Sequence, residues 1–104
     1  MSYHIEIAPV ALEALEAIVD RRTRSSVVRR IDTLAEEPNK QGKPLRGWLS
    51  GYMSVRAAGQ RYRVVYRIDS AERRVTAYMV GIRKEGSRQD VYVLAQRLVE
   101  RGLI

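Results

Sequence analysis

The stretch that decides the fold is YMSVRAAGQRYRVVYRIDSAERRVTAYMVGIR, residues 52–83. Its alternation of apolar and polar residues predicts three strands, Tyr52–Ala57, Arg61–Asp69 and Arg73–Arg83. Only three residues separate each strand from the next, and connections this short join antiparallel neighbours. The stretch therefore predicts a three-stranded antiparallel meander.

The same period of two assigns side chains to the two faces of the predicted sheet. The even-numbered residues of the central strand are apolar and predict a buried face: Tyr62, Val64, Tyr66 and Ile68. The opposite face of that strand then carries three arginines: Arg61, Arg63 and Arg67. The first strand adds further polar residues to this second face: Tyr52, Ser54 and Arg56.

The third strand brings one more arginine to the polar face. By alternation, Arg83 is expected on the same face as the smaller residues of this strand, Val75, Ala77, Met79 and Gly81. The opposite face carries the bulkier Tyr78, Val80 and Ile82. Four arginines are therefore expected on one concave, basic face: Arg56, Arg61, Arg63 and Arg83. Three tyrosines are expected in the core: Tyr62, Tyr66 and Tyr78.

The residues before the meander predict a strand and a helical hairpin. Alternation over Tyr3–Ile7 indicates the first strand. A helix begins at Pro9, which suits a first turn, and buries one stripe: Ala11, Leu12, Leu15, Ile18 and Val19. A second helix begins near Thr23 or Ser25 and ends before Pro38, because the residue preceding a proline disfavours the helical conformation. Its buried residues are Val27, Ile31, Leu34 and Ala35.

Residues 38–51 and the C-terminal residues complete the predicted fold. Two prolines and three glycines in 38–51 predict an ordered loop, anchored by a buried Trp48. A helical stripe predicts a last helix over Asp90–Arg101, ended by Gly102. The chain is thus predicted to be a single α+β domain, residues 1–104. Its sheet is four-stranded and mainly antiparallel, with the N-terminal helical hairpin and the C-terminal helix packed on one face.

The composition limits the class of protein. With 45% hydrophobic and 30% charged residues, the chain is predicted to fold around a core rather than stay disordered. It has no cysteine, which excludes disulfides, a thiolate nucleophile and zinc–thiolate sites. No signal peptide is evident, and no segment is long enough to span a bilayer. We therefore expect a cytoplasmic protein without a membrane partner.

The charge is distributed unevenly along the chain. The formal net charge is +7. Residues 1–37 contain five arginines against seven acidic residues, whereas residues 38–104 contain fourteen basic residues against five acidic ones. Sixteen of the nineteen basic residues are arginines, whose planar guanidinium can bind a phosphate through two hydrogen bonds or stack on a base. The second half of the chain therefore predicts a polyanionic partner.

The predicted basic face has two interpretations. Guanidinium groups beside the rings of Tyr52 and Tyr92 combine phosphate binding with base stacking, as recognition of single-stranded RNA requires. Alternatively, the arginines only solvate the polar face of an antiparallel sheet. Four arginines on converging strands, with few compensating acids, favour RNA binding. His4, the only histidine, is expected at the surface and outside the site.

Several motifs in this second half resemble the RelE/ParE toxin superfamily. They are LRG (45–47), LSGY (49–52), RYRVVYR (61–67), VGIRK (80–84) and DVY (90–92). The order of elements is also similar, so the resemblance covers nearly the whole chain. It implies a toxin of a type II toxin–antitoxin module whose RelE branch cleaves mRNA in the ribosomal A site. It also implies a cognate antitoxin, the ribosome and mRNA as partners, and no cofactor.

The chemistry implied by this resemblance is a metal-free attack of an RNA 2′-OH on the adjacent phosphate. Matched by motif, Arg63 and Arg83 would brace the phosphate, and Tyr92 would orient or stack on an mRNA base. Arg56 is expected to assist as an electrostatic brace. Further RNA-binding residues are expected to be Tyr52, Ser54, Arg61 and Lys84.

The chain departs from its relatives where they place a general base. RelE-type members carry two lysines in the strand that corresponds to Tyr52–Ala57, and this chain has none there. YoeB-type relatives carry a glutamate where this chain has Lys43, and their C-terminal histidine is also missing. The base is therefore unassigned. Two alternatives stay open: a ParE-type inhibitor of DNA gyrase, and a non-catalytic basic module that binds nucleic acid or a partner.

Overall fold

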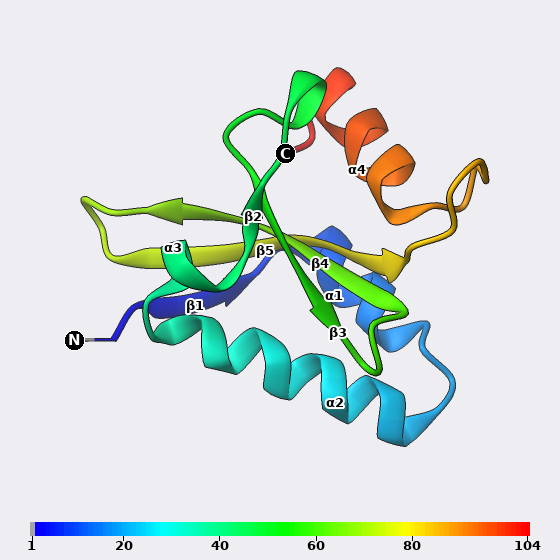
Figure 1. Ribbon diagram of the computed structural model, residues 1–104, viewed down its shortest axis with the longest axis horizontal. Helices are drawn as coiled ribbons and strands as arrows, with labels where there is room; N and C mark the ends of the chain where they lie inside the picture. The colour runs from blue at the N-terminus through cyan, green and yellow to red at the C-terminus, as the bar shows by residue number, and fades with distance from the viewer. Residues whose placement is uncertain (1) are drawn as a thin grey trace.

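The computed structural model describes residues 2–104 and shows a sheet covered by helices (Figure 1). The elements are β1 His4–Ile7, α1 Pro9–Glu16, α2 Arg21–Asp32, the 3₁₀ helix η1 Thr33–Ala35, α3 Pro38–Gln41, β2 Lys43–Pro44, the 3₁₀ helix η2 Gly47–Leu49, β3 Met53–Ala57, β4 Tyr62–Asp69, β5 Arg74–Ile82 and α4 Val91–Glu100. Strands β3, β4 and β5 agree with the predicted bounds to within one residue at each end. No helix among the described residues is long and apolar enough to cross a membrane.

Residues 2–104 form a sheet of five strands in the order β1-β5-β4-β3-β2. β1 runs parallel to β5, and the other neighbours are antiparallel. The α+β class and the meander are confirmed, but the predicted four strands were one too few. In the additional strand β2, Lys43 pairs with Ser54 and Pro44 with Met53. The expected loop at 38–51 thus contains α3, β2 and η2, because pairing with β3 organises its prolines and glycines.

Helices α1 and α2 form the predicted hairpin, but the turn between them comes earlier than expected. Pro9 is the first residue of α1. Asp20 caps α2, accepting hydrogen bonds from the backbone N–H of Thr23 at 2.9 Å and from its hydroxyl at 2.6 Å. Helix α1 ends at Glu16, and α2 begins at Arg21, directly after this cap. Val19 lies in the connection and is 95% exposed, not on a buried stripe.

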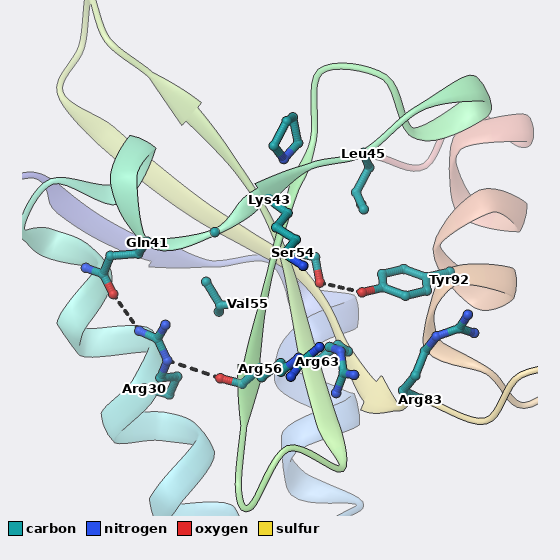
Figure 2. Close-up of a pocket in the computed structure, with 12 residues that line it drawn as sticks. Arg30, Gln41, Lys43, Leu45, Ser54, Val55, Arg56, Arg63, Arg83 and Tyr92 are labelled. Atoms are coloured by element: carbon teal, nitrogen blue, oxygen red, sulfur yellow. Dashed lines mark hydrogen bonds between the residues drawn. The ribbon is translucent and has the colours of Figure 1, made fainter.

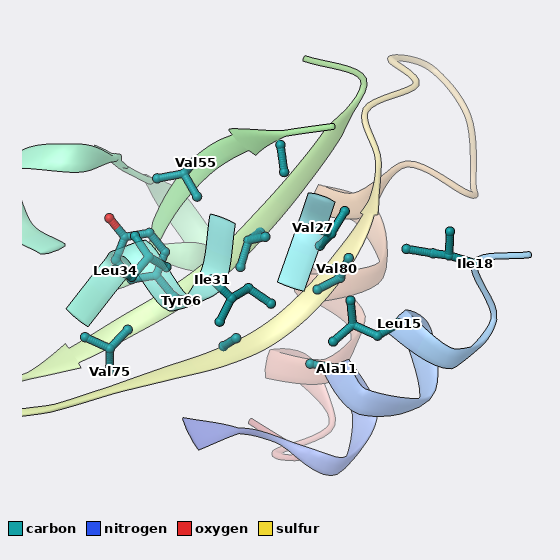
Figure 3. Close-up of a cluster of buried hydrophobic side chains, with 13 residues drawn as sticks. Ala11, Leu15, Ile18, Val27, Ile31, Leu34, Val55, Tyr66, Val75 and Val80 are labelled. Atoms are coloured by element: carbon teal, nitrogen blue, oxygen red, sulfur yellow. The ribbon is translucent and has the colours of Figure 1, made fainter. Parts of the chain in front are cut away.

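The helical hairpin covers one face of the sheet with an apolar core (Figure 3). Leu15 of α1 and Val27 and Ile31 of α2 are buried there. The sheet contributes Val55, Ala57, Val64, Tyr66, Val75, Ala77 and Val80. Leu12, also predicted in the stripe, is half-exposed instead. Burying each large apolar side chain stabilises the fold by roughly 1.5–3 kcal/mol, so this core supplies much of the stability.

Helix α4 packs against the opposite face, so the helices do not share one face as predicted. Asp90 caps its first turn, and Gly102 follows its last turn with a φ of +68°, as the sequence predicts. Leu103 N–H donates to the oxygen of Leu98 at 2.8 Å, which completes the C-terminal cap. Val91 and Ala95 of α4 are buried against residues of the sheet and the preceding turn: Leu49, Tyr52, Val65 and Met79. The rest of this face stays open and carries the arginines.

A β-bulge changes which way the side chains of β5 point. The register between β4 and β5 shifts at residues 65–66, and Tyr78 is left without a paired residue. Val75 and Ala77 therefore face the hairpin, whereas Met79 faces α4. Strict alternation predicted that Val75, Ala77 and Met79 share one face. This prediction was wrong, because the bulge inserts one residue into β5. Tyr78 packs in the α4 cluster instead of the hairpin core.

Candidate active site

A pocket of about 580 Å³ opens on the part of the sheet that α4 leaves uncovered (Figure 2). Strands β3 and β4 form its floor, and α2, α3, β2 and the start of α4 form its rim. Among the described residues that line it, none is acidic and five are basic: Arg30, Lys43, Arg56, Arg63 and Arg83. A concave basic surface is thus present, as the sequence predicts, although its residues differ in part from the predicted ones.

Arg56 of β3 and Arg63 of β4 lie directly opposite each other on the floor of the pocket. Like charges in this position repel each other. The turn between the strands supplies acceptors that hold both side chains. Gln60 Oε1 accepts from Arg56 Nη1 at 2.9 Å, and the backbone oxygens of Gln60 and Tyr62 accept from Arg63 Nη1, the second at 3.2 Å. Because these acceptors are neutral, the two positive charges stay uncompensated.

Arg83, which follows β5, is held by two carboxylates and a ring. Its Nη1 donates to Asp90 Oδ1 at 2.7 Å, and its Nη2 donates to Glu85 Oε1 at 3.0 Å. Its Cζ atom lies 4.9 Å from the centre of the Tyr92 ring. The hydrogen bond to Asp90 raises the pKa of Arg83 above its ordinary value. Arg83 therefore stays charged and suits electrostatic stabilisation better than proton transfer.

Asp90 links Arg83 to helix α4. Its carboxylate is 2% exposed and also accepts from the backbone N–H groups of Lys84 at 2.6 Å and Tyr92 at 3.1 Å. Burial alone would raise the pKa of this carboxyl group, but the hydrogen bonds outweigh burial and lower the pKa of Asp90. Asp90 is thus ionised at neutral pH and positions both an arginine of the pocket and the first turn of α4.

Two hydroxyl groups meet at the rim of the pocket. Ser54 Oγ and Tyr92 Oη lie 2.7 Å apart, which joins β3 to the first turn of α4. Ser54 is buried and Tyr92 is half-buried. Arg83 covers one face of the Tyr92 ring. The hydrogen bond at the hydroxyl and the guanidinium over the ring together fix the position of Tyr92 beside the arginines.

The structure brings most of the predicted site residues together. Those that line the pocket are Ser54, Arg56, Arg63, Arg83 and Tyr92. Tyr52 is 5% exposed and packs edge-on against Tyr78, with ring centres 5.6 Å apart. Its ring is therefore not accessible to a base, contrary to the expected stacking role. Arg61 and Lys84 line an adjacent hollow of about 590 Å³, which Arg83 shares with the pocket.

Two basic residues of the pocket, Arg30 and Lys43, were not predicted. Arg30 extends from α2 and donates to the backbone oxygen of Arg56 at 3.1 Å, to Thr33 Oγ1 at 2.8 Å and to Gln41 Oε1 at 2.5 Å. Helical periodicity shows only that Arg30 lies off the buried stripe. Lys43 lies in a segment predicted to be irregular. The one sequence feature that could have indicated Lys43 as a site residue is its position, where YoeB-type relatives carry a glutamate.

Gly42 allows β2 to approach β3 closely. A Cβ atom at residue 42 would lie 2.8 Å from the backbone oxygen of Ser54, and it would also clash with the Tyr66 hydroxyl. That hydroxyl donates to the backbone oxygen of Pro38 at 2.8 Å, and burial raises the pKa of Tyr66. Since only glycine fits this position, the neighbouring Lys43 is held at a defined place on the rim.

Three further observations concern residues outside the pocket. Trp48, predicted to be a buried anchor, is 60% exposed, because the turn η2 directs Leu49 inward in its place. His4 is exposed on β1 and does not line the pocket, as expected. Within residues 2–104, no cluster of three or more His, Cys, Asp or Glu side chains could hold a metal ion.

Comparisons with known proteins decide the family. A family model described as "ParE toxin of type II toxin-antitoxin system, parDE" matches residues 5–86. Toxin RelE of Mycobacterium tuberculosis is 32% identical over 88 residues, which cover 85% of this chain and 89% of that relative. The chain belongs to the RelE/ParE toxin superfamily. It is accordingly a toxin of the type II toxin–antitoxin class, as the sequence motifs predict.

Solved structures of RelE/ParE toxins share the fold of this member. The toxin–antitoxin complex RelBE2 of Mycobacterium tuberculosis matches with a TM-score of 0.72 and 32% identity, covering 80% of this chain and 100% of that chain. A mutant of the Escherichia coli toxin RelE in the free state also matches with a TM-score of 0.72, at 17% identity and 100% coverage of both chains. At 17% identity the second likeness concerns the fold alone.

Proposed function

We propose that this RelE/ParE toxin is a ribosome-dependent endoribonuclease that cleaves mRNA in the A site. The observation that carries the proposal is the pocket, in which five cations and two hydroxyls converge without an acidic group among the described lining residues. Such a pocket attracts a phosphodiester, and its fixed charges stabilise additional negative charge on the phosphorus.

The reaction is an internal transesterification of RNA. The 2′-oxygen forms a bond to the adjacent phosphorus, and the bond from phosphorus to the 5′-oxygen breaks. The 2′-OH loses one proton and the leaving 5′-oxygen gains one, so the products are a 2′,3′-cyclic phosphate and a 5′-hydroxyl. In this proposal Arg63 and Arg83, which line the pocket, brace the phosphorane oxygens, and Arg56 assists from the adjacent strand. Donors of this kind contribute about 10²- to 10³-fold each in other enzymes.

Tyr92 is proposed to position the mRNA rather than to move a proton. Its hydroxyl is bound to Ser54, Arg83 lies over one face of its ring, and the half-buried side chain lines the pocket, where it can contact an mRNA base. No carboxylate or imidazole lies among the described residues that line the pocket. The acceleration is therefore proposed to rest on orientation of the attacking oxygen and on charge stabilisation more than on general base catalysis.

A cognate antitoxin is the second proposed partner. The support is the related RelBE2 structure from Mycobacterium tuberculosis, which is a toxin–antitoxin complex at 32% identity to this chain. We propose that the antitoxin neutralises the toxin by restricting access to the basic pocket, through an acidic segment that lies over or beside it.

The test is brief induction of the wild-type chain in cells, followed by mapping of new mRNA 5′ ends. Growth arrest with cuts inside translated codons, in register with the reading frame, is expected. The Arg63→Ala variant, expressed at the same soluble level, should produce neither effect. Normal growth and intact mRNA with the wild-type chain would overturn the proposal.

A second candidate function is inhibition of DNA gyrase. Two observations favour it: the matching family model is that of a ParE toxin, and β3 lacks the two lysines of RelE-type members. Induction would then cause DNA breaks and an SOS response, without new mRNA ends. The same experiment therefore separates the two functions. A third reading, a non-catalytic binding module, predicts that Arg63→Ala lowers only salt-sensitive affinity for nucleic acid.

A further inference from the structure

Among the described residues, Lys43 differs from the other four cations of the pocket in having no partner. The four arginines all donate hydrogen bonds within the protein, for example Arg30 to Gln41 and Arg56 to Gln60. In residues 2–104, the Lys43 ammonium takes part in no hydrogen bond and no ion pair, although it lines the same pocket. An ammonium group left free among like charges is ready to bind an anion, because that contact requires no internal bond to be broken.

The position of Lys43 relative to the two hydroxyls is fixed by strand pairing. Lys43 of β2 lies opposite Ser54 of β3, and directly opposed residues have Cβ atoms about 4.5–5.5 Å apart on the same face. Ser54 in turn contacts Tyr92 at 2.7 Å. Figure 2 shows the Lys43 side chain extending toward Ser54 at the pocket rim. Lysine, serine and tyrosine thus form a row that closes the side of the pocket opposite the β3–β4 turn.

The backbone around Lys43 is held firmly enough for a specific contact. Leu45 N–H donates to the Tyr52 oxygen at 2.9 Å, which fixes β2 on one side of the lysine. Gly42 fixes the other side, since its backbone is pressed against Ser54 and Tyr66. A lysine on a mobile loop would be a diffuse positive charge, whereas this one projects from a paired strand.

We infer that Lys43 binds the scissile phosphate of RNA and serves as an additional catalytic residue of this toxin. This inference rests on the proposed ribonuclease function and names a contact in the same pocket. The ammonium donates to a non-bridging phosphate oxygen and stabilises the charge that develops as the 2′-oxygen attacks. It thereby supplies from β2 a lysine that β3 does not carry.

The test uses the full chain with three substitutions. Lys43→Ala removes the contact, and Lys43→Arg keeps the charge but cannot accept a proton. Lys40→Ala is the matched control, because Lys40 lies on the neighbouring α3, outside the pocket lining, and pairs with Glu37 at 2.9 Å. Cleavage of mRNA on purified ribosomes is expected to fall about 10²-fold in Lys43→Ala, and to stay within about tenfold in Lys43→Arg. It should be unchanged in Lys40→Ala.

A binding measurement separates this inference from the function on which it rests. The probe is a short single-stranded RNA with 2′-O-methyl groups, which cannot be cleaved because its nucleophile is blocked. Lys43→Ala should lower the slope of log affinity against log salt by about 0.7, and Lys40→Ala should lower it less. If the wild type cuts no mRNA but this difference persists, the phosphate contact is supported and the ribonuclease function fails.

Two results would overturn the inference. In the first, Lys43→Ala cleaves RNA and binds the probe like the wild type, so that the ammonium contacts no phosphate. In the second, Lys43→Arg is as inactive as Lys43→Ala although it folds normally, which would show that charge alone does not account for the role of Lys43.

Discussion

The two faces of strand β4 carry opposite kinds of side chain. On one face Val64 and Tyr66 are fully buried beneath the helical hairpin. On the other face Arg63 and Arg67 flank Val65, which is buried beneath α4. The first face contributes almost only to folding, whereas the second is divided between a small core and a charged pocket. Under the proposed function, activity depends on the second face and most of the stability on the first, so substitutions should largely separate the two.

The largest expected effect is on the hairpin face. Ile31→Ala should lower the free energy of unfolding by about 2–5 kcal/mol, because Ile31 is completely buried and the change leaves a cavity. Urea denaturation followed by circular dichroism measures this. Val19→Ala is the control, since Val19 is 95% exposed and should change stability by less than about 0.5 kcal/mol. Equal effects of the two substitutions would contradict the assigned core.

The next effect concerns the open face and should appear in activity alone. Arg63→Ala is expected to lower ribosome-dependent cleavage by about 10²- to 10³-fold, because a brace for the phosphorane is lost. Arg67→Ala, on the same face of the same strand but outside the pocket, should keep near wild-type cleavage. Cleavage rates and unfolding free energies of both variants are measured together. A large loss of stability in Arg63→Ala would show that the two faces are not separable.

A third prediction concerns Asp90, which joins the open face to the core beneath α4. Its pKa is lower in the folded protein than the roughly 3.9 of an unfolded aspartate, so its stabilising effect is complete above about pH 5. This effect is lost as the pH falls through the folded-state pKa. Asp90→Asn should therefore cost about 1.5–3 kcal/mol at pH 7 and flatten the dependence of stability on pH below 5. Denaturation curves at a series of pH values test this, and an unchanged acid slope would argue against it.

The smallest effect is expected at the hydroxyl pair. Ser54→Ala removes the hydrogen bond to Tyr92 and should reduce cleavage by about two- to tenfold, equivalent to roughly 0.5–1.5 kcal/mol. Ser50→Ala, at an exposed serine nearby in the chain, is the matched control. Initial cleavage rates at saturating ribosomes provide the measurement. An effect as large as that of Arg63→Ala would mean that Tyr92 does more than position the mRNA.

The regular elements could be predicted from sequence because their causes are local. Alternation located β3, β4 and β5 to within one residue, and Asp90 and Gly102 marked the two ends of α4. The bulge at Tyr78 could not be predicted, because an inserted residue keeps the local alternation and shows only in the pairing with β4. Strand β2 was missed for a related reason, since its two residues become a strand only through β3.

The candidate site was predictable where strand parity decides it. Arg56 and Arg63 follow from alternation, and the structure brings them together on the pocket floor. Arg30 and Lys43 come from elements whose approach to the pocket depends on tertiary packing, and no periodic pattern contains that information. For Tyr52, alternation predicted the correct face of the sheet. It could not show that α4 and η2 cover the ring and bury it.

Strand β2 also affects self-association. An unpaired sheet edge can add a strand from another molecule, and proteins restrain this with short edge strands, prolines and lysines. Strand β2, at one of the two edges of this sheet, consists of Lys43 and Pro44, a charged residue and one without a backbone N–H. A positive charge and a missing donor thus discourage edge-to-edge pairing into larger aggregates. Lys43 thus belongs both to the pocket and to the edge of the sheet.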